Sequence, residues 1–167
     1  AEPLSDFARV LRKAVPEATL NVYGKFVSDE DERSVCENEN VVYHGLVPYD
    51  EIPKALSEAS VVIHCENKEK LENLRYAFST KIADSLACGR PFLVYASEEF
   101  PFVKYLKENK AAHIAGNERD LETVLVKMKN DEEYRNMYIS SATDLAQKNH
   151  NLQKNCDFVQ EIIEKLL

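Results

Sequence analysis

The chain has 167 residues, of which 44% are hydrophobic and 30% charged, and its formal net charge at pH 7 is −8. These values are typical of one globular domain with a sizeable core, and they exclude a disordered chain. The acidic balance argues against nucleic-acid binding, which requires a basic face. No apolar run approaches the roughly 20 residues of a membrane span, and no signal-peptide pattern is present. We expect a cytoplasmic protein whose longer parent remains free to associate peripherally with a membrane.

Neither a disulfide framework nor a metal site is predicted. The four cysteines (Cys36, Cys65, Cys88 and Cys156) are widely spaced and form no C-x-x-C pair, which is typical of a reducing compartment. The acidic run at 29–32 lies in a polar stretch, and we interpret it as a solvated loop rather than a cation site.

Apolar residues at helical spacing predict an amphipathic helix over residues 4–14 at the start of the chain. Strands are predicted at 19–23 and 41–45. We interpret the acidic stretch between them, 28–40, as a loop with room for a helical turn. Asp50 is a suitable N-cap for the helix that follows.

The run Ser60-Val61-Val62-Ile63-His64-Cys65 predicts a third strand. It is apolar without alternation, as expected of a strand that is covered on both faces. A charged segment leads from it to a second series of elements. The predicted elements are a helix at 79–88, a strand at 91–95, a helix at 98–108, a strand at 112–115 and three helices from 118 to the end.

Strands that alternate with helices predict right-handed βαβ units. We therefore expect an α/β fold, a Rossmann-like doubly wound parallel sheet with C-terminal helices, in a single domain over residues 1–167. A doubly wound unit usually begins with a strand, whereas this chain begins with a helix. We expect that the first strand is missing from this fragment.

The segment FSTKIADSLACGRPFLVY, residues 78–95, is the candidate site. In open α/β sheets ligands bind beyond the carboxyl ends of the strands, at helix N-termini. Ser79 or Thr80 is placed to cap a helix whose N–H groups favour an anion, and Lys81 adds a full positive charge. Asp84 lies one turn further on the same face, where its carboxylate is placed to accept hydrogen bonds from a ribose. On spacing alone, a surface ion pair between Lys81 and Asp84 is the favoured interpretation.

This segment resembles the signature of the C-terminal domain of family 4 (group 1) glycosyltransferases, which have the GT-B fold. Upstream, LNVYGKF and ENVVYHGLVPYDEIPKALSEASVVIH are similar to that domain's strand, its G-x-V loop, its helix and its next strand. The resemblance covers nearly the whole chain, in order. When this resemblance is added to the spacing, the preferred interpretation of the segment is a site that binds a diphosphate and a ribose.

The resemblance implies a retaining transferase that moves a sugar from a nucleotide-diphospho-sugar to a glycan, lipid or polysaccharide precursor, without metal or cofactor. The nucleotide would lie on this domain and the acceptor on an N-terminal domain, so the fragment alone would be inactive. Ser79 and Thr80 match the helix start that faces the diphosphate, and Lys81 matches the lysine of a variant signature. Asp84 matches the second glutamate of an E-x7-E pattern, which holds the ribose.

The chain departs from the family pattern at both glutamate positions of the E-x7-E pattern. Asp84 is one methylene shorter than glutamate, and Tyr76 stands where the first glutamate is expected, so that role is unfilled unless Glu72 or Glu66 shifts into it. The family's basic pair after the first strand would precede residue 1. These departures keep open an alternative function, a non-catalytic GT-B-like domain that acts as a partner or regulatory subunit.

The last helix, 152–167, resembles the tail that crosses back to the N-terminal domain in GT-B proteins. An equally good alternative is a helix that packs on its own sheet.

Overall fold

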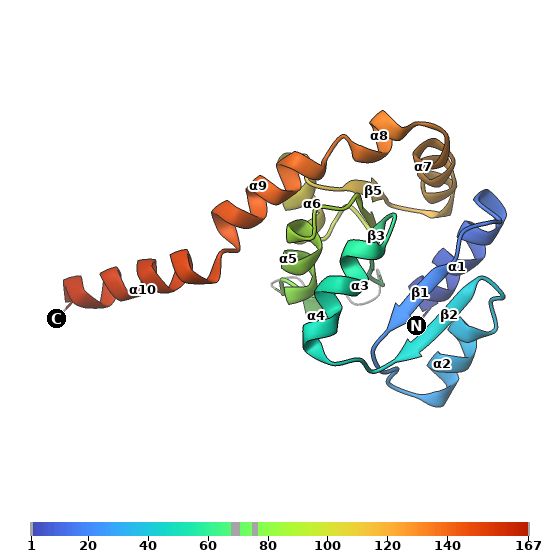
Figure 1. Cartoon of the computed structure of the whole chain (residues 1–167), viewed down its shortest axis with the longest axis horizontal. Helices are drawn as coiled ribbons and strands as arrows, with labels where there is room; N and C mark the ends of the chain where they lie inside the picture. The colour runs from blue at the N-terminus through green and yellow to red at the C-terminus, as the bar shows by residue number, and fades with distance from the viewer. Residues whose placement is uncertain (1, 68–70, 75–76, 167) are drawn as a thin grey trace.

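The computed structural model describes residues 2–67, 71–74 and 77–166, and within them it is an α/β arrangement with helices on both sides of parallel strands (Figure 1). β1 (Leu20–Tyr23) pairs with β2 (Val41–Gly45), and β3 (Val62–Cys65), β4 (Phe92–Tyr95) and β5 (His113–Ala115) form a second sheet in that order. Every pairing is parallel. The predicted α/β fold with parallel strands is confirmed, but the strands are divided between two small sheets.

Each strand is joined to the next through helical structure, as parallel pairing requires. The helices are α1 (Glu2–Ala14), α2 (Asp29–Cys36), α3 (Ile52–Glu58), α4 (Leu71–Leu74), α5 (Thr80–Ala87), α6 (Pro101–Glu108), α7 (Glu118–Asn130), α8 (Glu132–Asn136), α9 (Ile139–Asn149) and α10 (Leu152–Leu166), with a 3-10 turn η1 (Tyr49–Glu51) before α3. None of the described helices is long and apolar enough to cross a membrane.

The core consists of two apolar clusters, one on each face of the strands. Leu93 of β4 is buried in the cluster beneath α1 and α7, whereas Phe92 and Val94 are buried in the cluster formed by α5, α6 and α9. Successive side chains of a strand point to opposite faces, so a strand between two helical layers must be apolar at every position. This explains the uninterrupted apolar run that predicts β4.

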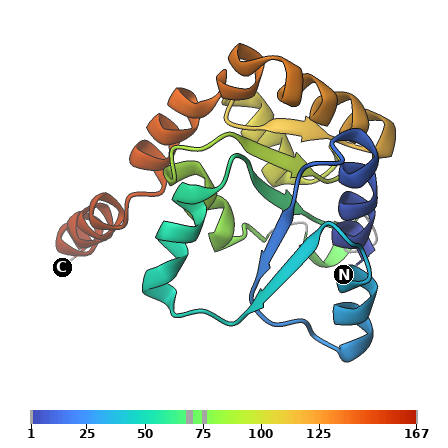
Figure 2. The same cartoon turned by 45° about the vertical axis from the view of Figure 1, so that its right-hand side comes forward.

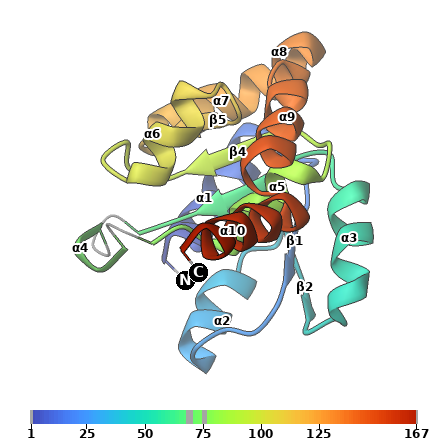
Figure 3. The same ribbon diagram turned by 90° about the vertical axis from the view of Figure 1, so that its left-hand side faces the viewer.

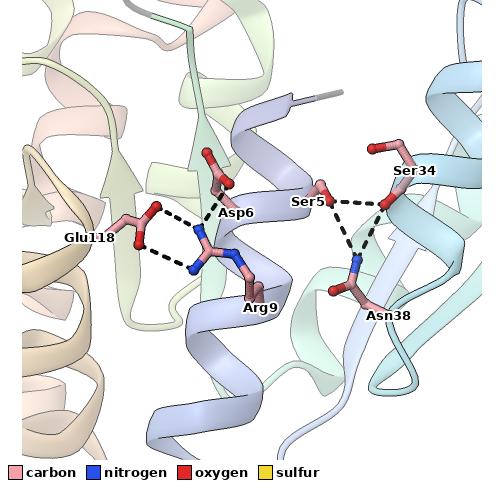
Figure 4. A network of polar contacts seen from close by, with 6 residues as sticks. All are labelled: Ser5, Asp6, Arg9, Ser34, Asn38 and Glu118. Carbon is pink, nitrogen blue, oxygen red and sulfur yellow. Dashed lines mark hydrogen bonds and ion pairs between the residues drawn. The ribbon is translucent and has the colours of Figure 1, made fainter.

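Polar contacts hold α1 against the helices on either side of it (Figure 4). Arg9 donates two hydrogen bonds to the carboxylate of Glu118 at the start of α7, at 3.2 and 2.5 Å. On the other side, Ser5 Oγ donates to the carbonyl oxygen of Ser34 at 2.9 Å, and Asn38 Nδ2 donates to the same oxygen at 3.3 Å. α1 therefore lies between α2 and α7 and is bonded to both.

Three local predictions are wrong. Residues 28–40 contain the helix α2, because Ser28 caps it by accepting from Asp31 N at 3.1 Å and the acidic run at 29–32 lies in its first turn, where the helix dipole favours negative charge. Asp50 lies inside η1 and does not cap α3, whose N-cap position is Glu51. The three helices predicted from 118 to the end are four within the described residues, because the middle one is divided into α8 and α9.

α10 extends away from the rest of the chain in Figure 1. In Figure 3, where that side faces the viewer, α10 lies in front of the other elements. None of its described residues is buried, although it carries large apolar side chains. The exposed apolar residues are Leu152, Phe158, Val159, Ile162, Ile163 and Leu166. The alternative in which this helix packs on its own sheet is therefore wrong.

Candidate functional site

The start of α5 lies in the connection between β3 and β4. Ser79 occupies the N-cap position with extended backbone angles (φ −68°, ψ 128°), as predicted, but its side chain makes no capping hydrogen bond. Ile82 N donates to Ser79 O at 3.0 Å. In the described part of the chain, the N–H groups of Thr80 and Lys81 are therefore the ones in the first turn that are left for an anion. Gly89, with φ +69°, follows the last turn in the left-handed conformation that glycine favours at this place.

Lys81 and Asp84 are both exposed on α5, one turn apart. Within the described residues, neither side chain has a hydrogen-bond or ion-pair partner. The ion pair that spacing alone favours is therefore not formed in this part of the chain. Both charged groups are left accessible to a ligand.

His64, near the end of β3, lies close enough to Lys81 for the positive charge of the lysine to change the pKa of the imidazole. Its ring is half-buried and meets Phe102 edge to face, with centroids 5.3 Å apart. Burial lowers the pKa of His64, Glu66 raises it and Lys81 lowers it further. A lowered pKa favours the neutral imidazole, so Lys81 provides the positive charge at this end of β3.

Three predicted site positions remain, Glu66, Glu72 and Tyr76, and the described residues include the first two. Glu66 directly follows β3, and its N–H donates to Tyr95 O at 3.1 Å, so it remains at the edge of the sheet. Glu72 is exposed on α4. Tyr76 lies outside the described residues. Ser79, Thr80, Lys81 and Asp84 are thus brought together at the start of one helix, and the roles assigned to them stay predictions.

An aromatic contact beside the helix start was missed by the sequence reasoning. Phe78 stacks on His150 at the end of α9 (5.2 Å, 16°) and meets Tyr105 of α6 edge to face (5.6 Å, 84°). Tyr105 Oη and His150 Nε2 are 3.0 Å apart. The signal in the sequence is an aromatic residue directly before an N-cap, a place where apolar contacts fix the entry of a helix.

No group of three or more His, Cys, Asp or Glu side chains in the described ranges is placed to hold a metal ion. What the site offers an anionic ligand is backbone N–H groups and one lysine. The carboxylate of Asp84, one turn away, suits hydroxyl groups rather than a second anion.

A family model described as glycosyl transferase-like matches residues 5–161. No curated protein matches the chain. Two solved structures of HepE from Anabaena have a similar fold, one in complex with UDP (TM-score 0.78) and one in complex with UDP-glucose (TM-score 0.76). Each is 13% identical, and each match covers 96% of this chain and 44% of HepE. The chain therefore spans less than half the length of HepE, and at this identity the likeness shows the fold alone.

Proposed function

The chain belongs to the glycosyl transferase-like family, and on that premise we propose that it is the donor-binding, C-terminal half of a GT-B glycosyltransferase of the family 4 type. Its ligand would be a nucleotide-diphospho-sugar. The observation that carries this proposal is the start of α5, where a helix without a side-chain cap carries an unpaired Lys81 within the described residues.

The diphosphate would lie against the first turn of α5. Backbone N–H groups and Lys81 would stabilise the negative charge that develops on the nucleoside diphosphate as it leaves. The backbone N–H groups are fixed by the helix before the reaction, so they need little reorganisation. We infer a metal-independent reaction from the family resemblance alone.

Asp84 would accept hydrogen bonds from the two ribose hydroxyls. Its side chain is exposed, and it lies one helical turn from Lys81 on the same helix. A carboxylate can accept from two donors at once. The fold likeness to a protein solved with UDP and with UDP-glucose supports this class of ligand.

The acceptor would bind an N-terminal domain of the same parent chain, with the sugar transferred in the cleft between the domains. We infer a retaining reaction and a glycan, lipid or polysaccharide precursor as the acceptor from the family resemblance. The exposed apolar side of α10 supports a partner domain, because a helix with this many uncovered large side chains gains free energy when they are buried. The fragment alone would bind the donor without transferring its sugar.

Isothermal titration of the folded parent chain with UDP, GDP and ADP tests this proposal. We expect saturable binding of at least one of the three, competed by the matching nucleotide-sugar. A folded parent that binds none of them would contradict the donor-site assignment. Binding without release of the nucleoside diphosphate from any nucleotide-sugar would instead favour the non-catalytic partner, which the tyrosine at position 76 keeps as the second candidate.

A further inference from the structure

Three aromatic rings from distant parts of the chain meet beside the start of α5. Phe78 stacks on His150, with the ring centroids 5.2 Å apart, and meets Tyr105 edge to face at 5.6 Å. Tyr105 and His150 also meet edge to face, at 5.9 Å. In Figure 2, α9, in orange, lies beside α5, in green, and this packing brings the rings together. We call Phe78, Tyr105 and His150 the aromatic brace.

Hydrogen bonds hold His150 in its place in the brace. Asn149 Nδ2 donates to Tyr105 Oη at 2.9 Å, and Tyr105 Oη lies 3.0 Å from His150 Nε2. Since the hydroxyl accepts from Asn149, we assign its own proton to a bond with Nε2, which leaves a neutral imidazole with its proton on Nδ1. The backbone is fixed as well, because His150 N donates to Ala146 O at 2.9 Å, at the end of α9.

The start of α5 lacks the contact that commonly fixes a helix N-terminus. Ser79 occupies the N-cap position, but its side chain makes no capping hydrogen bond. An apolar residue directly before the N-cap can fix the entry of the chain instead, by packing its side chain. In the common form of this contact the partner lies in the same helix, whereas Phe78 packs on Tyr105 of α6 and on His150 of α9.

The brace lies next to the two backbone donors that are left for an anion. Thr80 and Lys81 follow Phe78 by two and three positions, so the direction of their N–H groups depends on how the chain enters the helix. Ile82, which is fully buried, holds the first turn to the core. Phe78 is 41% exposed and lies at the surface. Loss of the brace should therefore disturb these donors more than it disturbs the core.

We propose that the aromatic brace positions the N–H groups of Thr80 and Lys81 for the diphosphate, with His150 as a positioning residue outside the donor site. This inference rests on the proposed function and adds that α6 and α9 help to set the affinity for the diphosphate. Hydrogen bonds are directional, and donors that are held in place before binding lose less conformational freedom than donors that must first be ordered. A nucleoside has no phosphate groups, so its binding should not depend on the brace.

NMR relaxation of the backbone amides in the folded parent chain, without nucleotide, tests the brace itself. The order parameters of Thr80 and Lys81 should be about 0.85 in the wild type, as in rigid backbone, and should fall towards about 0.6 in Phe78→Ala and in His150→Ala. His150→Phe keeps a ring that can stack on Phe78, so it should keep the values of the wild type.

Titration calorimetry of the same proteins tests the consequence for binding, with whichever of UDP, GDP and ADP binds best and with its nucleoside. Diphosphate binding should weaken about 3- to 10-fold in His150→Ala, the range that one aromatic pair accounts for, and should stay close to the wild type in His150→Phe. Adding His150→Ala to Phe78→Ala should cause no further loss, since both changes remove the same contact. Nucleoside binding should be unchanged in every variant.

His44→Ala is the matched control. His44 stacks on Tyr23, with centroids 4.4 Å apart, on the β1–β2 sheet, so this variant loses a similar stacked pair and leaves the brace intact. It should leave the order parameters of Thr80 and Lys81 and both affinities unchanged.

The possible failures are distinguishable. If the wild type binds a diphosphate, unchanged order parameters or unchanged diphosphate binding in His150→Ala would overturn the brace alone. An equal loss for the diphosphate and the nucleoside would also overturn it, because it would indicate a general loss of structure. A folded wild type that binds no diphosphate would contradict the donor site itself, and with it the proposal that the brace serves that site.

Discussion

Arg9 and Glu118 form a two-pronged ion pair that joins the first helix of the chain to the helix after the last strand (Figure 4). Asp6 adds a third contact, 3.1 Å from Arg9 Nη2. The hydrogen bond from Arg9 lowers the pKa of Glu118. Since both side chains are about half exposed, solvent screens much of this attraction.

Arg9→Ala and Glu118→Ala, alone and combined, should show a coupling free energy of about 0.5 kcal/mol and at most about 1 kcal/mol. Urea unfolding of the four proteins measures it. In 1 M NaCl the coupling should largely disappear, because the Debye length is then about 3 Å. A coupling above these values that persists in salt would show that the pair is not a screened surface contact.

His113 should make the protein less stable in mild acid. It is buried beside Tyr134 and Tyr138, and burial lowers its pKa from the ordinary value of 6.5. The unfolded chain therefore takes up a proton near pH 6.5, whereas the folded chain does so only at lower pH, so the free energy of unfolding falls as the pH drops below about 6.5.

His113→Gln should flatten this decline between pH 7.5 and pH 5, measured by urea unfolding. An unchanged slope in the His113 variant would contradict the assignment. His64 and His150, whose pKa values are also lowered by burial, contribute to the remaining slope.

Asp84→Ala should weaken binding of a ribonucleoside diphosphate by roughly tenfold, the effect of about 1.5 kcal/mol for a hydrogen bond to a charged group. The 2′-deoxy analogue should lose much less, because one of the two proposed hydroxyl donors is already gone. Titration calorimetry with both ligands measures the difference. If Asp84→Ala weakened the binding of the ribonucleoside diphosphate and of its 2′-deoxy analogue by the same factor, Asp84 would not contact the 2′-hydroxyl of the ribose.

Val159→Asp on α10 should scarcely change the unfolding midpoint of the fragment, because Val159 is 54% exposed there. In the longer, two-domain parent that we propose, the same change should weaken the association of the two halves and lower the midpoint of thermal unfolding. Val126→Asp on α7, at a valine that is 41% exposed, is the matched control. Identical behaviour of the two variants in the parent would argue against a partner domain on α10.

The strands were well predicted because runs such as Phe92 to Tyr95 are apolar at every position, and a buried parallel strand imposes that pattern. The start of α5 was predicted for a similarly local reason, since Ser79 is a common N-cap residue and Gly89 ends the helix. The acidic helix α2 was missed because it buries only Val35 and therefore lacks an apolar stripe. Its cap, Ser28, was the only strong signal.

The surroundings of the site were beyond prediction because they depend on residues distant in sequence. Phe78 meets His150, seventy-two positions away, through the packing of α9 beside α5. The division of the strands between two sheets also depends on tertiary structure, since no local pattern records which strand lies beside which. The effect of Lys81 on His64 arises in the same way.

The most direct test of the donor site compares the wild-type parent chain with Lys81→Ala in calorimetric titrations with the nucleoside diphosphate that binds best and with its nucleoside. Lys148→Ala, at an exposed lysine of α9, controls for loss of one charge. We predict a loss of roughly 10- to 100-fold for the diphosphate in the Lys81 variant only, since a hydrogen bond to a charged group is worth about 1.5–3 kcal/mol, and no change for the nucleoside. Diphosphate binding that is the same in the wild type and the Lys81 variant would contradict the account.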